Sequence, residues 1–199
     1  SRKFTTSSTF YDPGYCSVYG KRVNNFDTSR PFGNVTLATA LQYSVNSVFC
    51  NIGLKLGAKA LVKQAKALGL YERPPLETPE SERLPSGLYK GGELYDPRRD
   101  RDVDPGRMAF GQERLLVTPL QMAMVAGTIG NDGILMRPFV VEKTVTPNGK
   151  TRTRTRPTKI RRAVTPATAR DVGDMMVQAV RAGTGTAAQV PGLRIGGKT

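Results

Sequence analysis

The feature that most constrains the fold is an apolar helical stretch, residues 36–57, that polar residues break in the middle: TLATALQYSVNSVFCNIGLKLG. Four apolar side chains in its second half recur on one helical face: Val48, Phe49, Ile52 and Leu56. This spacing predicts an amphipathic helix that buries one side in a core. Ser44-Val45-Asn46 interrupts the pattern, and Ser and Asn favour turns and helix starts because they bond to nearby backbone groups. The three residues therefore either cap a junction between two core helices or hold a hydroxyl and a carboxamide at the wall of a pocket.

Three further segments carry helical patterns, two of them with distinct start signals. Residues 58–70 form an amphipathic repeat. Thr118-Pro119 supplies the cap and the first-turn proline of a helix start, and Gln121 stands where a capping box would place it. Thr165-Pro166 repeats the start signal, and the apolar periodicity that follows predicts a helix that ends at Gly183.

Strand patterns lie in the second half of the chain. Residues 134–145 are rich in β-branched and apolar residues, Pro147-Asn148-Gly149 predicts a tight turn, and residues 150–156 alternate as KTRTRTR. This combination predicts a β-hairpin whose second strand shows an arginine face. Residues 193–199, LRIGGKT, predict a further strand, and the paired glycines would let another backbone or a ligand come close.

Two long segments have the composition of loops. Residues 1–35 are rich in Ser, Thr, Gly, Pro and Asn, and residues 71–107 carry six prolines and a run of mixed charge. Aromatic residues in the first segment are expected to anchor it to the body of the protein. With 199 residues, the chain fits one domain or a large piece of one, and it can bury a sizeable core.

The chain is strongly basic, with 30 Lys and Arg against 16 Asp and Glu, which gives a net charge of +14. Such a balance predicts contact with something anionic: a nucleic acid, an anionic membrane surface or an acidic polymer. Residues 150–162 hold seven basic and no acidic residues, which fits either a solvated edge strand or an anion-facing patch. No aromatic residue lies among these basic residues, which argues against a nucleic-acid surface.

Histidine is absent from the 199 residues. This excludes Ser-His-Asp and Cys-His catalysis within the chain and any histidine-based metal site, and no cofactor is expected. Acid–base chemistry near neutral pH would need a Lys, Asp, Glu or Tyr with a shifted pKa. Cys16 and Cys50 are the two cysteines. They can form one disulfide. The alternative is a buried free thiol, since Cys50 lies on the apolar helix.

We expect residues 1–199 to be a single partial domain, a fragment cut at both ends. The chain begins SRKFTTSSTF without a Met, and it stops at Gly197-Lys198-Thr199 within a strand pattern. No stretch approaches the roughly 18 apolar residues of a membrane span. Because the ends are expected to be cut, the lack of a targeting signal carries little weight.

Three motifs, taken in order, resemble the transpeptidase domain of class B penicillin-binding proteins. Ser44-Val45-Asn46 resembles the family's Ser-x-Asn motif, and Gly197-Lys198-Thr199 resembles the start of its Lys-Thr-Gly strand. Residues 111–133, GQERLLVTPLQMAMVAGTIGNDG, resemble the segment between these motifs. The resemblance covers nearly the whole chain, and among subtypes the chain is similar to the actinobacterial penicillin-binding protein A group. It implies an α+β fold of the penicillin-binding and serine β-lactamase type, here the helical subdomain with part of the antiparallel sheet.

The resemblance implies roles for five residues. Ser44 would relay a proton to the leaving group, and Asn46 would bond the substrate amide and position the lysine of the Ser-x-x-Lys motif. Lys198 would be a second cation that lowers the pKa of that lysine, so that it can act as a base. Thr199 would bind the terminal carboxylate of the substrate, and Gly197 would be a second substrate-binding residue.

The chain departs from the family pattern in two places. The family's nucleophile lies in a Ser-x-x-Lys motif, but none of the nine serines here has a lysine three positions on. The glycine that closes the Lys-Thr-Gly motif is also missing. The resemblance therefore implies that this chain by itself is inactive.

For the intact protein, the resemblance implies a serine D,D-transpeptidase that cross-links peptidoglycan. It would pass an acyl group from a D-Ala-D-Ala stem peptide to a neighbouring stem amine, and it would bind β-lactams. Division or elongation proteins would be partners, and nucleic acid would not. The site would lie at the extracytoplasmic face of the bacterial cell membrane, with a single-pass anchor outside these residues. The alternatives are a carboxypeptidase or β-lactamase-like hydrolase, a non-catalytic penicillin-binding sensor or scaffold, and a basic nucleic-acid binder.

Overall fold

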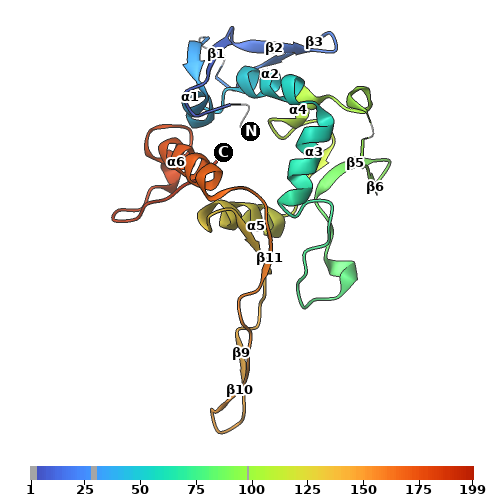
Figure 1. Cartoon of the computed structure of the whole chain (residues 1–199), viewed down its shortest axis with the longest axis vertical. Coiled ribbons are helices and arrows are strands. Elements are labelled where there is room, and N and C mark those ends of the chain that lie inside the picture. The colour runs from blue at the N-terminus through green and yellow to red at the C-terminus, as the bar shows by residue number, and fades with distance from the viewer. Residues whose placement is uncertain (1–3, 28–30, 98) are drawn as a thin grey trace.

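The chain folds as a set of helices with small sheets at their periphery (Figure 1). The computed structural model describes residues 4–27, 31–97 and 99–199. The helices are α1 (Leu37–Gln42), α2 (Asn46–Leu56), α3 (Ala58–Ala67), α4 (Pro105–Met108), α5 (Pro119–Gly130) and α6 (Pro166–Ala182), with short 3-10 turns at Glu80–Glu82, Asp100–Asp102 and Thr186–Ala188. Helix α2 contacts α1, α3, α4 and the first three strands of the chain, so it connects most of the N-terminal half.

The strands pair in small antiparallel sheets rather than in one large sheet. β1 (Thr9–Asp12) pairs with β4 (Gly33–Thr36), β2 (Tyr15–Val18) with β3 (Lys21–Asn24), β8 (Ile134–Met136) with β11 (Lys159–Arg162), and β9 (Lys143–Val145) with β10 (Thr151–Arg154). β5 (Gly87–Lys90) pairs with both β6 (Glu93–Leu94) and β7 (Leu115–Leu116). Together with the helices, these sheets give the α+β fold that the sequence implied.

Two clusters of buried apolar side chains join helices to sheets. The first joins α1 and α2 to β1 and β4: Phe10, Val35, Ala40, Val45, Val48 and Ile52. The second joins α3 and α4 to β5: Ala58, Val62, Leu88, Val103 and Met108. A fully buried Val, Leu, Ile, Phe or Met side chain contributes roughly 1.5–3 kcal/mol. The first cluster therefore holds α1 and α2 on the β1–β4 sheet, and the second holds α3 and α4 on β5.

A disulfide between Cys16 and Cys50 ties β2 to α2. The Cα atoms lie 6.5 Å apart, and both side chains are buried. The structure therefore selects the disulfide over the free thiols that the sequence left open. A crosslink between residues 34 positions apart restricts the unfolded chain and stabilises the folded one by about 3–4 kcal/mol.

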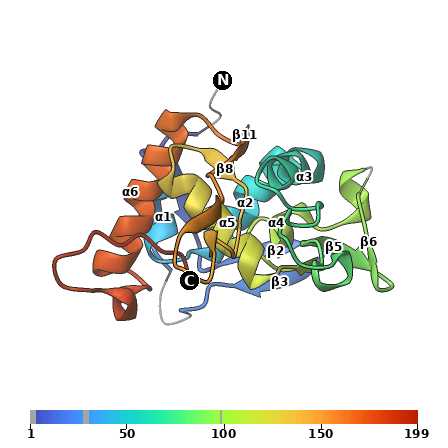
Figure 2. The ribbon, with the colours of Figure 1, turned by 90° about the horizontal axis from the view of Figure 1, so that it is seen from below.

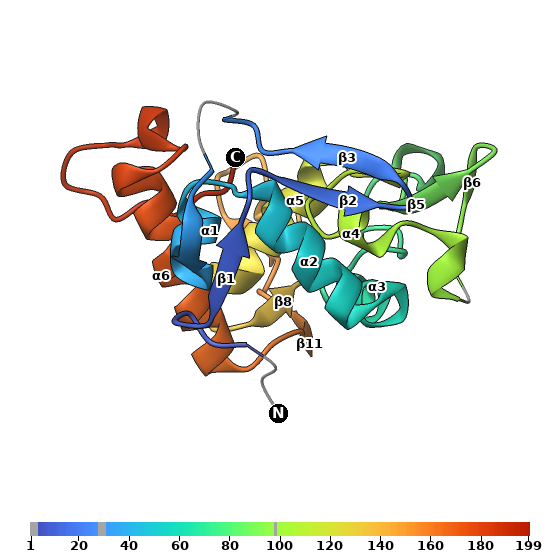
Figure 3. The same cartoon turned by 90° about the horizontal axis from the view of Figure 1, so that it is seen from above.

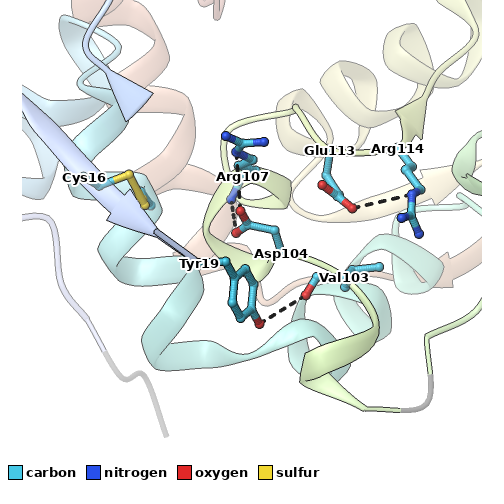
Figure 4. A network of polar contacts seen from close by, with 8 residues as sticks. Cys16, Tyr19, Val103, Asp104, Arg107, Glu113 and Arg114 are labelled. Carbon is cyan, nitrogen blue, oxygen red and sulfur yellow. Dashed lines mark hydrogen bonds and ion pairs between the residues drawn. A yellow bond between two sulfur atoms is a disulfide. The ribbon is translucent and has the colours of Figure 1, made fainter. Parts of the chain in front are cut away.

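The turn between β2 and β3 packs on α4 beside this disulfide (Figure 4). The Tyr19 hydroxyl donates to the Val103 carbonyl at 3.5 Å. Asp104 caps α4 by accepting from the Arg107 N–H at 3.0 Å, and its carboxylate pairs with Arg107 Nε at 3.4 Å. The first contact ties the β2–β3 turn to the residue before the cap of α4, and the other two stabilise the start of α4.

Two segments that we predicted to be loops contain regular structure. Residues 1–35 include β1, β2, β3 and the start of β4, because Phe10, Cys16 and Val18 are buried while their exposed neighbours alternate with them. Residues 71–107 include the β5–β6 hairpin and α4. That hairpin turns at Gly91-Gly92, where both residues have positive φ, as a two-residue hairpin loop requires.

The predicted capping box at the start of α5 is wrong in its second half. Thr118 accepts from the Gln121 N–H at 3.2 Å, as a helix cap should. The Gln121 side chain, however, accepts from the Ser86 N–H at 2.6 Å and donates to the carbonyls of Gly69 and Glu72 at 2.7 and 2.9 Å. Gln121 is thus a buried link between α5 and two distant segments.

The predicted basic hairpin is confirmed, and it forms an arm that extends away from the rest of the protein (Figure 1). Strand β10 is exposed along its whole length, and β8 with β11 forms the base of the arm. Arg161 pairs with Glu72 of the body at that base. Within the described ranges, no helix combines the length and the apolar character needed to cross a membrane.

The contact between α2 and α4 depends on Gly53, and we expect Gly53→Ala to weaken it. A Cβ on Gly53 would lie 2.6 Å from the Ala109 Cβ and closer still to the Pro105 carbonyl oxygen. Overpacking of this kind costs about 1–3 kcal/mol of unfolding free energy, measurable by denaturant unfolding. Gly127→Ala in α5 is the matched control, because nothing lies within 4 Å of a Cβ there, and it should stabilise by about 0.5–1 kcal/mol. Equal midpoints for Gly53→Ala and the wild type would contradict the expectation.

Candidate active site

The end of α6 docks on the end of α1, directly before Ser44. Figures 2 and 3 show α1 between α6 and α2. Gln42 donates from Nε2 to the Ala182 carbonyl at 2.9 Å, and its own carbonyl accepts from the Thr184 N–H at 3.2 Å. A Cβ at Gly183 would collide with the Gln42 carbonyl oxygen. A glycine is therefore required where α6 ends, as predicted, and here the reason is the close approach of two helices.

The last residues return along α6 and do not form the strand that we predicted. The Gly197 N–H donates to the Met176 carbonyl at 3.2 Å, and no strand among the described residues lies beside residues 193–199 to pair with them. The predicted close approach at the two glycines is confirmed. A Cβ on Gly196 would lie 3.3 Å from Met176, and one on Gly197 would lie 3.3 Å from Val180.

This docking brings Lys198 to Ser44 across 154 positions of sequence. Lys198 Nζ donates to Ser44 Oγ at 2.7 Å, and it also donates to the Thr199 carbonyl. The Thr199 hydroxyl lies 2.7 Å from the Thr184 hydroxyl. Ser44, Lys198 and Thr199 border a cleft of about 280 Å³, which is lined by Leu41, Ser44, Asn46, Phe49, Ala109, Phe110, Lys198 and Thr199.

Ser44 occupies a strained turn between α1 and α2. Its φ is 54°, in the left-handed region that costs a non-glycine residue roughly 1–2 kcal/mol. The Ser44 N–H donates to the Leu41 carbonyl, and the Val45 N–H donates to the Ala40 carbonyl at 2.9 Å. The capping interpretation is wrong, because the N-cap residue of α2 is Val45, which makes no side-chain cap bond. The turn joins the two helices and places the Ser44 hydroxyl at the border of the cleft.

Asn46 begins α2 and lines the cleft. Its Nδ2 donates to the Asn24 carbonyl at 3.1 Å, which fixes the plane of the carboxamide. Among the described residues, none donates to Asn46 Oδ1, so this oxygen is available to a ligand in the cleft.

Lys198 has a lowered pKa because its surroundings are partly desolvated. Burial of the ammonium group holds the pKa of Lys198 below its ordinary value of 10.5. The cleft lining contains no second cation within the described part of the chain, so the expected pair of lysines is not formed by these residues. Gly197 lies beside Lys198 and its N–H is used by Met176, so within this chain it positions the segment.

Four residues of the cleft were missed by the sequence analysis. Leu41, Phe49, Ala109 and Phe110 form its apolar surface. Phe49 was assigned to the core from its helical spacing, and it is only half-buried. Phe110 follows α4, just after the predicted loop 71–107, and no local pattern indicated that it would line the same cleft as Ser44.

Comparisons with known proteins show what the chain is similar to. The family model described as "Penicillin binding protein transpeptidase domain" matches residues 1–199. A peptidoglycan D,D-transpeptidase, PbpA of Mycolicibacterium smegmatis, is 36% identical over 172 residues, which are 85% of this chain and 32% of that protein. The chain thus spans about a third of the length of the curated relatives it matches.

Two solved structures share the fold over nearly the whole chain. The ceftriaxone acyl-enzyme complex of penicillin-binding protein A from Mycobacterium tuberculosis has a TM-score of 0.80 and 28% identity, and the match covers 98% of this chain and 42% of that one. The D,D-transpeptidase domain of a peptidoglycan glycosyltransferase from Eggerthella lenta has a TM-score of 0.77 and 30% identity, covering 98% and 48%.

The lowered pKa of Lys198 predicts how stability changes with pH. The pKa of Lys198 in the folded state lies below its ordinary value of 10.5. At a pH between the folded-state pKa and the pKa of the unfolded chain, the unfolded chain therefore binds more protons. The contribution of Lys198 to the unfolding free energy consequently rises with pH in this range. The test is the difference in unfolding free energy between the wild type and Lys198→Met, from about pH 7 to about pH 10. This difference cancels the other titrating groups, and it should move in favour of the wild type as the pH rises. A flat difference, or one that moves toward the methionine variant, would contradict the assignment.

Proposed function

Because the chain belongs to the penicillin-binding protein transpeptidase family, we propose that it supplies part of the acyl-transfer site of a peptidoglycan D,D-transpeptidase. The observation that carries the proposal is the 2.7 Å hydrogen bond from Lys198 Nζ to Ser44 Oγ at the border of the cleft. A hydroxyl bonded to an ammonium group whose pKa is lowered by burial is suited to proton transfer. This arrangement takes the place of histidine, which the chain lacks.

The proposed reaction forms and then consumes an acyl-serine ester. The nucleophile is the serine of a Ser-x-x-Lys motif that these 199 residues do not contain. Its oxygen attacks the carbonyl between two D-alanines, its proton passes to the base, and the C–N bond breaks. The departing amine takes a proton from the Ser44 hydroxyl, which is replenished from Lys198. The base passes the proton it took to Lys198, which restores the relay. A neighbouring stem amine then attacks the ester carbonyl, the ester C–O bond breaks as the new C–N bond forms, and the proton that the amine loses goes to the serine oxygen.

The remaining residues of the cleft bind the donor peptide in this proposal. Asn46 Oδ1 accepts from a substrate amide, and the Thr199 hydroxyl with the Lys198 charge binds the terminal carboxylate. Phe49 and Phe110 form the apolar wall against which the alanine methyl groups pack. β-Lactams would acylate the same serine by imitating the donor.

Transfer to an amine is favoured over hydrolysis by the relatives. The relative from Mycolicibacterium smegmatis is named a peptidoglycan D,D-transpeptidase, not a carboxypeptidase or a β-lactamase. An extracytoplasmic location is supported by the Cys16–Cys50 disulfide, since disulfides persist in oxidising compartments. A membrane anchor outside these residues, partners from the division or elongation machinery, and the assignment of 1–199 to one partial domain stay predictions from the family resemblance.

We expect Ser44→Ala in the full-length protein to slow acylation about 10²- to 10⁴-fold, the usual contribution of a positioned proton-transfer group. The measurement is the second-order rate constant for labelling by a fluorescent penicillin. Ser17→Ala is the control, because Ser17 is exposed on β2 and lies outside the cleft lining, and its labelling should match the wild type. Near wild-type labelling of folded Ser44→Ala would remove the relay role.

A further inference from the structure

A buried polar cluster lies under the Ser44–Asn46 turn, outside the cleft. At its centre is the carboxylate of Asp12, at the end of β1, whose exposed fraction is 0%. Asp12 accepts from the Gly14 N–H at 2.7 Å and from the Phe32 N–H at 2.9 Å. It also accepts from Asn25 Nδ2 at 2.9 and 3.0 Å and from the Ser47 hydroxyl at 2.5 Å. One carboxylate therefore accepts hydrogen bonds from four segments of the chain.

Asn25 links this cluster to the first turn of α2. The residue in the N-cap position of α2 is Val45, which has no side-chain oxygen and makes no cap bond. Asn25 Oδ1 accepts from the Ser47 N–H at 3.0 Å, so it takes over the role of the missing cap from 22 positions away. Its neighbour Asn24 accepts the bond from Asn46 Nδ2. The turn that carries Ser44 and Asn46 is thus held on its buried side by a rigid polar anchor.

The cluster is built for an ionised carboxylate. Burial by itself would raise the pKa of Asp12, but the hydrogen bonds from Ser47, Phe32, Gly14 and Asn25 outweigh it and hold that pKa below its ordinary value. A buried charge with satisfied hydrogen bonds has little freedom to move, because any displacement leaves a charged oxygen without its donors.

We propose that Asp12, Asn25 and Ser47 are positioning residues that hold Ser44 and Asn46 in their catalytic geometry. This inference rests on the proposed function. Ser44 sits in a strained conformation, and a strained residue keeps its geometry only where its surroundings over-determine it. The anchor supplies that constraint three residues after Ser44, through residues that do not line the cleft. The two serines of the SVNS sequence thus have different roles, because Ser44 faces the cleft and Ser47 fixes the turn.

A merely structural cluster would lower stability without changing the reactivity of folded protein, so the test is a double-mutant cycle. In the full-length protein, Ser47→Ala is made in the wild-type background and in one where Ser44 and Asn46 are both alanine. The readout is the second-order rate constant of labelling by a fluorescent penicillin, per folded molecule, well below the unfolding temperature. In the wild-type background, the rate should fall about ten- to a hundredfold, since small misplacements of a reacting group are this costly. In the double-alanine background, the same change should alter the rate less than about twofold.

Ser86→Ala is the matched control for the loss of a buried serine. Ser86 is also 0% exposed, and its Oγ accepts from the Thr118 N–H at 2.8 Å, away from the cleft. It should lower the unfolding temperature as Ser47→Ala does and leave the labelling rate within about twofold of the wild type. If Ser47→Ala does not fold, Ser47→Cys, which keeps the volume and a weak donor, should give an intermediate loss of rate.

Two results would overturn the proposal. One is an unchanged labelling rate of folded Ser47→Ala or Ser47→Cys in the wild-type background. The other is an equal loss of rate in both backgrounds, which would mean that Ser47 does not act through Ser44 and Asn46. Failure of the proposed function is recognised separately, because the double-alanine background would then label as fast as the wild type before Ser47 is changed.

Discussion

The buried charge of Asp12 is the constraint on which the arrangement of the N-terminal half depends. An ionised carboxylate removed from water is strongly destabilising unless donors surround it. Here the donors come from the turn after β1, the segment before β4, Asn25 and the first turn of α2. They can converge only when β1, β4 and α2 have all formed. The same condition sets the direction in which α2 begins, and therefore where Ser44 points.

The second half of the chain is held near Ser44 by close backbone contacts that leave no room for larger side chains. Gln42 is bonded to both sides of Gly183, and the two glycines before Lys198 lie against α6. Small residues at these positions allow backbone to meet backbone, which fixes distances better than flexible side chains do. The 2.7 Å bond between Lys198 and Ser44 is therefore the product of two rigid supports, the polar anchor on one side and the α1–α6 contact on the other.

Local signals in the sequence predicted the elements that are stabilised by local interactions. The Thr-Pro starts of α5 and α6, the glycine after α6 and the basic hairpin were all correct, because caps and turns act within a few residues. The strands before Val35 escaped prediction because each has only four residues and buries at most two side chains, which is too short a pattern to stand out among the Ser, Thr, Gly, Pro and Asn residues around it. Gln121 and Phe110 escaped it as well, because their partners are distant in sequence. Ser44 and Lys198 were paired by the family resemblance, and no local pattern would have paired them.

Ser44 and Ser47 show most clearly why residue type alone could not assign roles in this site. Both are serines near the start of one helix, and either could have capped it by the usual preference. The positive φ of Ser44 turns its hydroxyl away from the helix and toward Lys198. Ser47, already within α2, directs its hydroxyl to Asp12. The difference arises from Asn25, whose side-chain oxygen accepts from the Ser47 N–H. The first turn of α2 therefore does not need a hydrogen bond from the Ser44 hydroxyl. A serine released from a structural role by a distant side chain is available for chemistry.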